Sequence, residues 1–302
     1  MPKRIVVLMS TYNGEKYLKT QIDSILNQRN VDVELWVRDD GSHDKTADIL
    51  EEYSKKHELV YFRGENRKPA RSFMELVKMA PKADFYAFAD QDDYWLPDKL
   101  SRAVDCLMTL DQTKPLLYYG FVTLVDKKLN ILKNHSINYC IFSRIEQAVI
   151  SSNATGCTMV FNEKLKREIS LFTPNYQIMH DEWIHKVCLS IGGELFYDSK
   201  SFIYYRQHEN NAIGANSNIY KVWKNRIIRV LKSDRKRSRG IQELLNGYKD
   251  KMPIHNREIC EMISDYTWNK KHKYQLLLSR SIKTGNIRTD IMYKLAVLLN
   301  QF

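Results

Sequence analysis

Three carboxylates, Asp90, Asp92 and Asp93, stand directly after an apolar run at 85–89. The run has the length and flanking residues of a buried strand, which would present the acids at its C-terminal end. Carboxylates crowded in this way repel one another unless a cation lies between them. Hard oxygen ligands suit Mg²⁺ or Mn²⁺, ions that usually share their coordination with substrate phosphates. The pattern therefore predicts a divalent-cation site. The alternative is a solvated acidic turn before a helix that begins at Asp98.

The elements that must position these acids alternate between strands and helices. Apolar runs predict strands at 5–9, 33–37 and 59–62, and helical spacing predicts helices over 17–26, 46–57 and 72–79. Such alternation is typical of an open α/β sheet with helices on both faces. Ligands of these sheets bind beyond the C-terminal strand ends. We expect Ser10-Thr11, Asp39-Asp40 and the acids after residue 89 to meet there in one crevice.

The pattern loosens beyond residue 100. We expect strands within 116–125 and at 157–161, 195–197 and 202–205, and a helix within 176–191. From residue 218 the chain reads as helical, with breaks near Gly240 and Pro253.

The bulk composition is that of a soluble globular protein, with 302 residues of which 43% are hydrophobic and 27% charged. The five cysteines lie far apart without a CxxC pair, which argues against a disulfide framework and a zinc site and fits a reducing compartment. No apolar stretch is long enough to span a bilayer, and the run at 5–9 is too short for a signal peptide.

The formal charge of +11 is unevenly distributed. Residues 1–213 hold 28 Lys and Arg against 29 Asp and Glu, whereas residues 214–302 hold 19 against 7. This asymmetry predicts a domain boundary near Gly214 and a polyanionic partner for the second part. Zinc-finger, RRM and helix-turn-helix signatures are absent from the sequence, so we do not expect nucleic-acid binding.

Residues 1–213 resemble the family 2 glycosyltransferases, which have the GT-A fold. The matching pieces occur in the expected order: VVLMSTYNGEKYL and SILNQ within 6–28, WVRDDGSHDKT at 36–46, ADQDDYWLPDKL at 89–100, HDEW at 180–183 and YRQHENN at 205–211. The last three resemble most the rhamnosyltransferase-like enzymes that build bacterial surface polysaccharides. The resemblance implies a Rossmann-like mixed sheet flanked by helices at 1–213, followed by a basic helical extension at 214–302.

The resemblance also implies roles for residues of the donor site. Thr11 and Tyr12 would line the nucleotide, and Arg71 would contact it. Asp39 would accept a hydrogen bond from the ring N–H that uracil and thymine share. The structural alternative for Asp39 is a turn and helix cap formed with Ser42.

For the metal, the resemblance implies Asp92 as a ligand, with Asp90 on the ribose or the metal and Asp93 nearby. His208 would lie on the metal or the diphosphate, and Arg206 would bind phosphate.

For the acceptor side, Asp181 matches the family's catalytic base. Adjacent Glu182 is the fallback, and a helix N-cap is the structural alternative for Asp181. Trp95 has two equally weighted interpretations, a sugar-stacking ring or a core residue.

These assignments imply an inverting glycosyltransferase that depends on Mn²⁺ or Mg²⁺. It would move one sugar from a UDP- or dTDP-sugar to a saccharide acceptor, possibly linked to polyprenyl diphosphate. The QxxRW signature of processive synthases is absent, which favours single transfer. The alternatives are a sugar-phosphate nucleotidyltransferase, for which the Gly-rich basic loop is lacking, and a catalytically inactive membrane-bound assembly subunit.

The basic tail begins with an amphipathic pattern at 219–231 that is followed by Arg235, Lys236, Arg237 and Arg239. Such a segment suits an anionic membrane surface. The alternative is a helix that docks on the catalytic domain or on a sister subunit of a homo-oligomer. We expect a cytoplasmic protein, peripheral at the inner face of the cell membrane.

Overall fold

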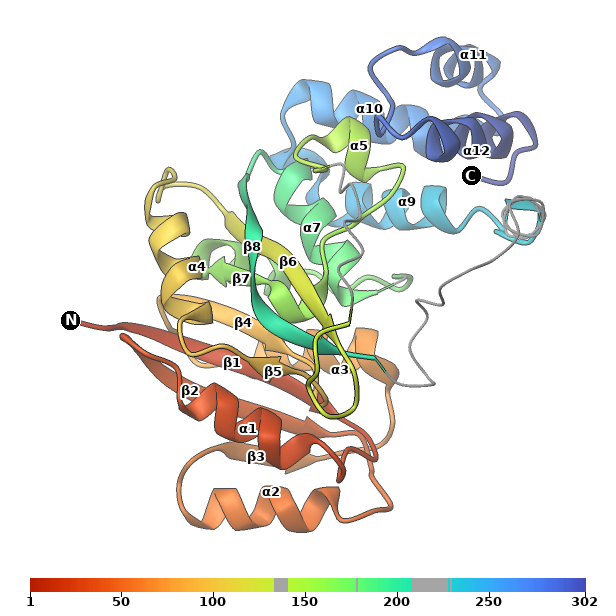
Figure 1. Ribbon diagram of the computed structural model, residues 1–302. Coiled ribbons are helices and arrows are strands. Elements are labelled where there is room, and N and C mark those ends of the chain that lie inside the picture. The colour runs from red at the N-terminus through yellow and green to blue at the C-terminus, as the bar shows by residue number, and fades with distance from the viewer. Residues whose placement is uncertain (133–140, 178, 208–227, 229) are drawn as a thin grey trace.

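The structure, a computed structural model, describes residues 1–132, 141–177, 179–207, 228 and 230–302 (Figure 1). One sheet with the strand order β3-β2-β1-β4-β7-β6-β8-β5 organises the first two thirds of the chain. Helices cover both of its faces, and further helices gather beyond α5 and α7 at one end of the molecule (Figure 1).

The first half of the sheet is parallel and alternates with helices, as the sequence predicts. Its strands are β1 (Lys3–Thr11), β2 (Val31–Asp39), β3 (Val60–Arg63) and β4 (Phe85–Ala89). Between them lie α1 (Leu18–Leu26), α2 (Thr46–Lys55) and α3 (Lys68–Met79). β1 is central and pairs in parallel with β2 and β4, so their C-terminal ends share one edge.

The second half of the sheet is mixed. β7 (Val160–Asn162) runs antiparallel to β4 and β6 (Leu116–Val125), and β8 (Glu194–Arg206) runs parallel to β6 and antiparallel to β5 (Tyr94–Trp95). The helices of this half are α4 (Lys99–Met108), α5 (Ile145–Ala148), α6 (Glu163–Leu171) and α7 (His180–Ser190).

The core is divided by the sheet, because successive side chains of a strand point to opposite faces. In β1, Ile5, Val7 and Met9 pack with α1, α2 and α4, while Val6 and Leu8 pack with α3, α6 and α7. Burial on both faces explains the continuous apolar run of this strand.

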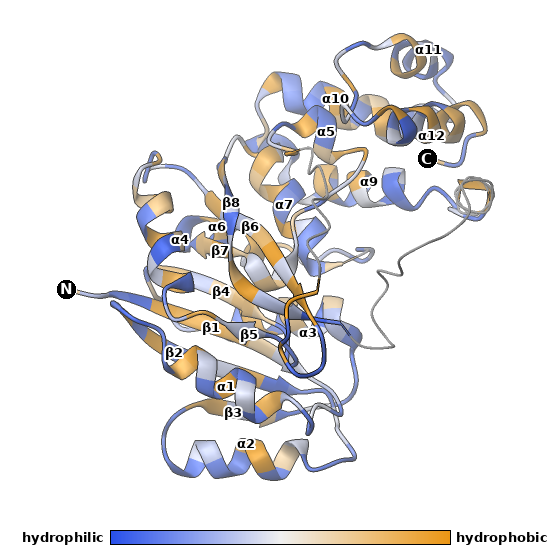
Figure 2. Ribbon diagram, in the orientation of Figure 1, coloured by the Kyte–Doolittle hydropathy of each residue, from blue (hydrophilic) through white to orange (hydrophobic). Residues whose placement is uncertain are grey.

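The C-terminal helices continue one of these cores. They are α9 (Lys236–Tyr248), α10 (Ile254–Asp265), α11 (Lys270–Leu278) and α12 (Ile287–Leu298). Buried Ile241, Leu244 and Tyr248 of α9 join the cluster that contains α7, and the Tyr248 ring lies 6.2 Å from that of Trp183. Apolar residues recur along both α7 and α9 in Figure 2.

Three predicted elements differ from the structure. The strands expected at 195–197 and 202–205 form one strand, β8, because the polar residues between them sit at a bulge opposite Gly120 and Phe121. Residues Gly156–Thr158 form a 3-10 turn rather than the start of a strand. Gly240 lies inside α9 instead of breaking it, because buried neighbours hold the helix in place.

The predicted amphipathic segment lies almost entirely outside the described residues, which include 228, 230 and 231 of its positions. The predicted domain boundary near residue 214 falls in the same stretch and stays a prediction. Among the described residues, none of the helices is both long and apolar enough to cross a membrane.

Candidate active site

The turns that follow β1 and β2 are locked together at the C-terminal edge of the sheet. Thr11 pairs with Asp39 in the strand register, and the Thr11 carbonyl accepts a hydrogen bond from the Asp40 amide at 2.8 Å. The Asn13 amide donates to the Ser42 hydroxyl at 2.9 Å, and the Gly14 amide donates to Thr46 Oγ1 at 2.8 Å. Hydrogen bonds therefore join the polar ends of these two strands into one continuous surface at the edge of the sheet.

Asp39 is fully buried between these turns, and its two carboxylate oxygens differ in their hydrogen bonding. Its Oδ1 accepts a hydrogen bond from the Ser42 amide at 3.1 Å. Its Oδ2 lies 3.3 Å from Arg63 Nε without a hydrogen bond among the described residues. This buried oxygen belongs to an ion pair with Arg63 but accepts no hydrogen bond among the described residues, which fits the predicted contact with a ring N–H. The alternative role for these residues was a turn and a helix cap. The cap is wrong, since Lys45, not Ser42, occupies the N-cap of α2.

Asp40 has a structural role instead. Its carboxylate pairs with the buried guanidinium of Arg38 and accepts a hydrogen bond from the Arg67 amide at 3.1 Å. Arg38 Nε also lies 3.1 Å from Glu75 Oε2, so this ion-pair network ties β2 to α3.

Gln91, which sequence reasoning missed, connects the β1 turn to the acidic motif. Its side-chain oxygen accepts from the Tyr12 amide at 2.9 Å, and its side-chain nitrogen donates to the Tyr12 carbonyl at 3.1 Å. Tyr12 is 44% exposed beside it, and the buried Thr11 hydroxyl has no hydrogen-bond partner among the described residues. Its position between Asp90 and Asp92 in the sequence could have indicated that Gln91 belongs to the site.

The acids after β4 form a compact cluster. Ligand atoms of Asp90, Asp93 and Cys157 lie within 4.8 Å of one another. Burial and the neighbouring charges of Asp92 and Asp181 raise the pKa of Asp90 to about 7. Burial likewise raises the pKa of Asp93 well above its usual range, and Asp93 Oδ2 is buried without a hydrogen bond among the described residues. Both features fit a divalent cation that would offset these charges, with Asp92 as its predicted ligand.

Cys157 of this cluster and the nearby Lys99 are buried as well. Burial raises the pKa of the Cys157 thiol well above its usual range, which keeps it neutral and agrees with a packing role. Lys99 is buried with its ammonium 3.6 Å from the centre of the Trp95 ring, and burial lowers its pKa to about 7. Trp95 itself is 1% exposed, so it belongs to the core and does not stack on a sugar.

Arg206 holds the acidic turn in place. Its Nε donates to the Asp92 carbonyl and its Nη1 to the Lys127 carbonyl, both at 2.7 Å, and its backbone amide donates to Asp93 Oδ1 at 3.3 Å. The guanidinium lies 4.3 Å from the centre of the Tyr17 ring. Its contact with a diphosphate stays a prediction. His208 lies outside the described residues.

Asp181 lies in the first turn of α7, close enough to Asp90 for their charges to interact. Its Oδ2 accepts from the Gly156 amide at 3.2 Å and its Oδ1 from the Glu182 amide at 2.7 Å. Met179, not Asp181, is the N-cap, so the capping alternative is wrong. Burial raises the pKa of Asp181, a change that favours a proton acceptor near neutral pH.

The residues beside Asp181 have different tasks. His180 is buried and stacks on Phe73 with ring centres 4.0 Å apart, and burial lowers its pKa to about 3. Burial would raise the pKa of Glu182, but the Lys186 ammonium at 2.5 Å outweighs it and the pKa lies below its ordinary value. Glu182 is thus engaged in an ion pair, which leaves Asp181 as the better base.

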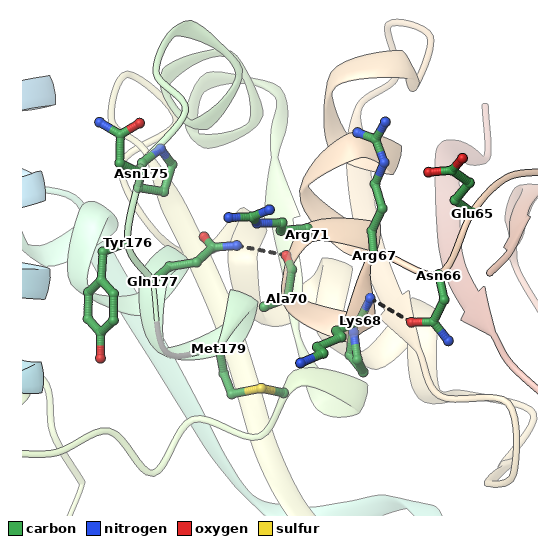
Figure 3. A pocket seen from close by; sticks show the side chains of 12 residues that line it. Glu65, Asn66, Arg67, Lys68, Ala70, Arg71, Asn175, Tyr176, Gln177 and Met179 are labelled. Carbon is green, nitrogen blue, oxygen red and sulfur yellow. Dashed lines mark hydrogen bonds between the residues drawn. The ribbon is translucent and has the colours of Figure 1, made fainter. Parts of the chain in front are cut away.

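Arg71 opens onto a cavity of about 790 Å³ beside this site (Figure 3). On one side lie Arg67, Lys68 and Arg71 at the beginning of α3, and on the other lies the loop that leads to α7. Gln177 bridges the two sides, since its side-chain nitrogen donates to the Ala70 carbonyl at 2.8 Å. The positive lining suits an anionic group, in agreement with the predicted nucleotide contact of Arg71.

The loop before α7 is also anchored by the C-terminal region. The Asn175 amide donates to Glu243 Oε2 of α9 at 2.8 Å, and the Arg239 guanidinium lies 4.5 Å from the centre of the Tyr176 ring. Sequence reasoning had no signal for these contacts, because they join segments more than sixty residues apart.

Comparisons with known proteins agree with this geometry. The model of the family described as Glycosyl transferase family 2 matches residues 6–168. The dTDP-rhamnosyl transferase RfbG of Shigella flexneri is 30% identical over 230 residues, which are 69% of this chain and 74% of that protein.

Solved structures share the fold. S. aureus TarS 1-349 in complex with UDP-GlcNAc has a TM-score of 0.56 at 16% identity, covering 99% of this chain and 93% of that chain. The mannosyltransferase PcManGT from Pyrobaculum calidifontis, in complex with GDP-Man and Mn2+, has a TM-score of 0.52 at 15% identity, covering 100% and 87%. The expected family and fold are confirmed: the chain belongs to glycosyl transferase family 2, has the GT-A fold and is similar to a rhamnosyltransferase.

Proposed function

We propose that this glycosyltransferase transfers one sugar, with inversion and with the help of Mn²⁺ or Mg²⁺, from a UDP- or dTDP-sugar to a saccharide acceptor. The observation that carries the proposal is the position of Asp181 beside the acidic cluster: its Oδ2 accepts from the Gly156 amide at 3.2 Å, and the ligand atom of the next residue, Cys157, lies within 4.8 Å of those of Asp90 and Asp93. It joins a candidate base to a candidate cation site although ninety residues separate them in the chain. The nucleotide-sugars bound by the structural neighbours support this donor class.

Each residue has one task in the proposed reaction. Asp39 accepts the ring N–H of the base, while Arg71 offers positive charge to the nucleotide. Asp90, Asp92 and Asp93 would hold the cation, which when bound stabilises the diphosphate that leaves. Asp181 takes the proton of the acceptor hydroxyl as its oxygen attacks the anomeric carbon from the face opposite the diphosphate. One carboxylate suffices, because the leaving group needs no protein acid.

The acceptor is proposed to be a lipid-linked intermediate of a surface polysaccharide, with the enzyme peripheral at the inner face of the membrane. The similarity to a dTDP-rhamnosyl transferase and the positive charge of the last third support this part. A nucleotidyltransferase is disfavoured by the family match.

The test compares Asp181→Asn with Glu182→Gln in the full chain. Nucleoside diphosphate release is measured with Mn²⁺, a panel of UDP- and dTDP-sugars and an acceptor, and donor binding is measured by calorimetry. Asp181→Asn should keep donor affinity and lose transfer by about 10²–10⁴-fold, the usual contribution of a general base. Glu182→Gln should retain activity within about tenfold. The reverse pattern would assign the base to Glu182, and retention of the anomeric configuration in the product would refute inversion.

A further inference from the structure

A second groove lies in the C-terminal region, apart from the donor site. It has a volume of about 430 Å³ and runs between α12, the beginning of α9 and the residues just before α9. Ile150, Met292, Tyr293 and Phe302 give it an apolar floor, in which the rings of Tyr293 and Phe302 lie 4.9 Å apart. A volume of this size holds a drug-sized ligand and is too small for a whole polymer chain.

The rim of the groove is positively charged. Lys232, Lys236 and Arg237 line it, and the described lining residues include neither aspartate nor glutamate. Lys232 and Lys236 are exposed and form no ion pair within the described ranges. An apolar floor with a cationic rim is complementary to an amphiphile that carries a phosphate on an apolar chain.

Arg237 connects the groove with the surroundings of the proposed base. Its guanidinium lies 5.9 Å from the centre of the Phe302 ring in the groove floor. The same guanidinium interacts electrostatically with Glu182, the residue after Asp181. Ile150 likewise stands just before the 151–156 loop, whose Gly156 donates to Asp181. α9, which begins at the rim with Lys236 and Arg237, packs on α7, the helix that carries Asp181, so a headgroup at the rim would lie on the side of the catalytic centre proposed for the acceptor.

The helices around the groove carry exposed apolar side chains. Trp268, Leu278 and Ile287 are 71%, 78% and 76% exposed. Residues 266–302 contain seven Lys and Arg but one Asp. Apolar side chains among cations suit an anionic lipid surface. Ile291 of α12 is also 48% exposed.

We propose that this groove binds the phosphate and the first part of the apolar chain of the lipid-linked acceptor. The inference rests on the proposed function, because it names the site for the acceptor of that reaction. Lys232, Lys236 and Arg237 bind the phosphate, and the floor between α9 and α12 receives the chain, whose remainder stays in the bilayer. The saccharide then extends toward Asp181.

The test uses soluble probes and the full chain without a bilayer. Binding of farnesyl diphosphate, inorganic pyrophosphate and farnesol is measured by calorimetry in EDTA, so that the cation-dependent donor site does not hold the diphosphate. Farnesyl diphosphate should bind more tightly than either half of the molecule alone. The Lys232→Ala/Lys236→Ala double variant should weaken this binding about thirtyfold, since each cation contributes roughly 1 kcal/mol.

Matched variants separate the groove from general charge effects. Lys270→Ala/Lys283→Ala removes the same charge from exposed positions of the same region and should leave farnesyl diphosphate binding unchanged. Met292→Gln should bring the affinity for farnesyl diphosphate toward that for pyrophosphate, because it makes the floor polar. Circular dichroism melting confirms that each variant is folded.

The outcomes separate a failure of the groove proposal from a failure of the proposed reaction. Equal loss in both lysine pairs, or no preference for farnesyl diphosphate over pyrophosphate, would overturn the groove. If the wild-type enzyme then still transfers sugar to a lipid-linked acceptor, the proposed function stands without it. If farnesyl diphosphate binds as expected but transfer to every acceptor fails, the groove stands as a phospho-lipid site and the proposed reaction falls.

Discussion

Replacing Gly156 by alanine should damage transfer far more than donor binding. A Cβ at Gly156 would lie 2.8 Å from His180 Nε2 and 3.4 Å from Asp181 Cβ. Ordinary van der Waals contact begins at 3.4 Å, so the turn or the ring must move by roughly 0.6 Å. The ring cannot yield easily, because Phe73 stacks on it and Phe88 meets its edge with ring centres 4.9 Å apart.

Two magnitudes follow from this displacement. Overpacking of a filled core destabilises a protein by about 1–3 kcal/mol. Displacement of a catalytic group by 1 Å can lower the rate about 100-fold, so a shift of half that size should lower kcat roughly tenfold or more. The hydrogen bond between the Gly156 amide and Asp181 Oδ2 would be lost or bent by the same movement.

The assay measures kcat, donor affinity and the melting temperature of Gly156→Ala, with Gly240→Ala as the control. A Cβ at Gly240 meets no atom within 4 Å, and alanine in a helix interior is favoured over glycine by about 0.5–1 kcal/mol. Gly240→Ala should thus be active and slightly more stable. Wild-type kcat and stability in Gly156→Ala would refute the argument that this contact positions the base.

Three further changes test other parts of the site. The pKa of His180 is near 3 when folded and about 6.5 when unfolded, so wild-type stability is retained above pH 6.5 and lost as the pH falls. Chemical denaturation should show that the free energy of unfolding falls by up to about 1.4 kcal/mol per pH unit relative to His180→Phe, which cannot titrate. A difference that does not change with pH would contradict the buried neutral ring. Glu243→Ala leaves the Asn175 amide without its acceptor, which should cost about 0.5–1.5 kcal/mol in melting experiments and weaken donor binding in calorimetry, because Asn175 lines the same cavity as Arg71; an unchanged donor affinity would speak against a role of this loop at the donor site. Gln91→Ala removes both hydrogen bonds to Tyr12 and should weaken donor binding in calorimetry, whereas an unchanged affinity would show that the turn holds itself.

The sequence predicts best what the parallel sheet dictates. Thr11, Asp39 and Asp90 follow strands that pair directly, so strand periodicity alone brings their positions to one edge. The alternation of strands with helices also indicates the order of the first half, because each crossover returns the chain in the same direction.

Contacts between distant segments explain what the sequence did not indicate. Asp93 is buried beside Cys157, a residue 64 positions further along the chain, so its burial could not be predicted from the acidic motif itself. Lys99, which the sequence analysis did not single out, is buried with its ammonium over the Trp95 ring. The continuity of β8 depends on its pairing with β6, which compensates for polar residues that interrupt its own pattern.

The apolar cluster that α7 shares with α9 limits how this enzyme can be divided. A cut or a graft at the change of charge near residue 214 would strip Ile241, Leu244 and Tyr248 from the helix that carries Asp181. Exchanging the C-terminal region between relatives would therefore require a matching set of side chains on α7. Under the proposed role of the groove, acceptor binding and the position of the catalytic base depend on the same packing between α7 and α9.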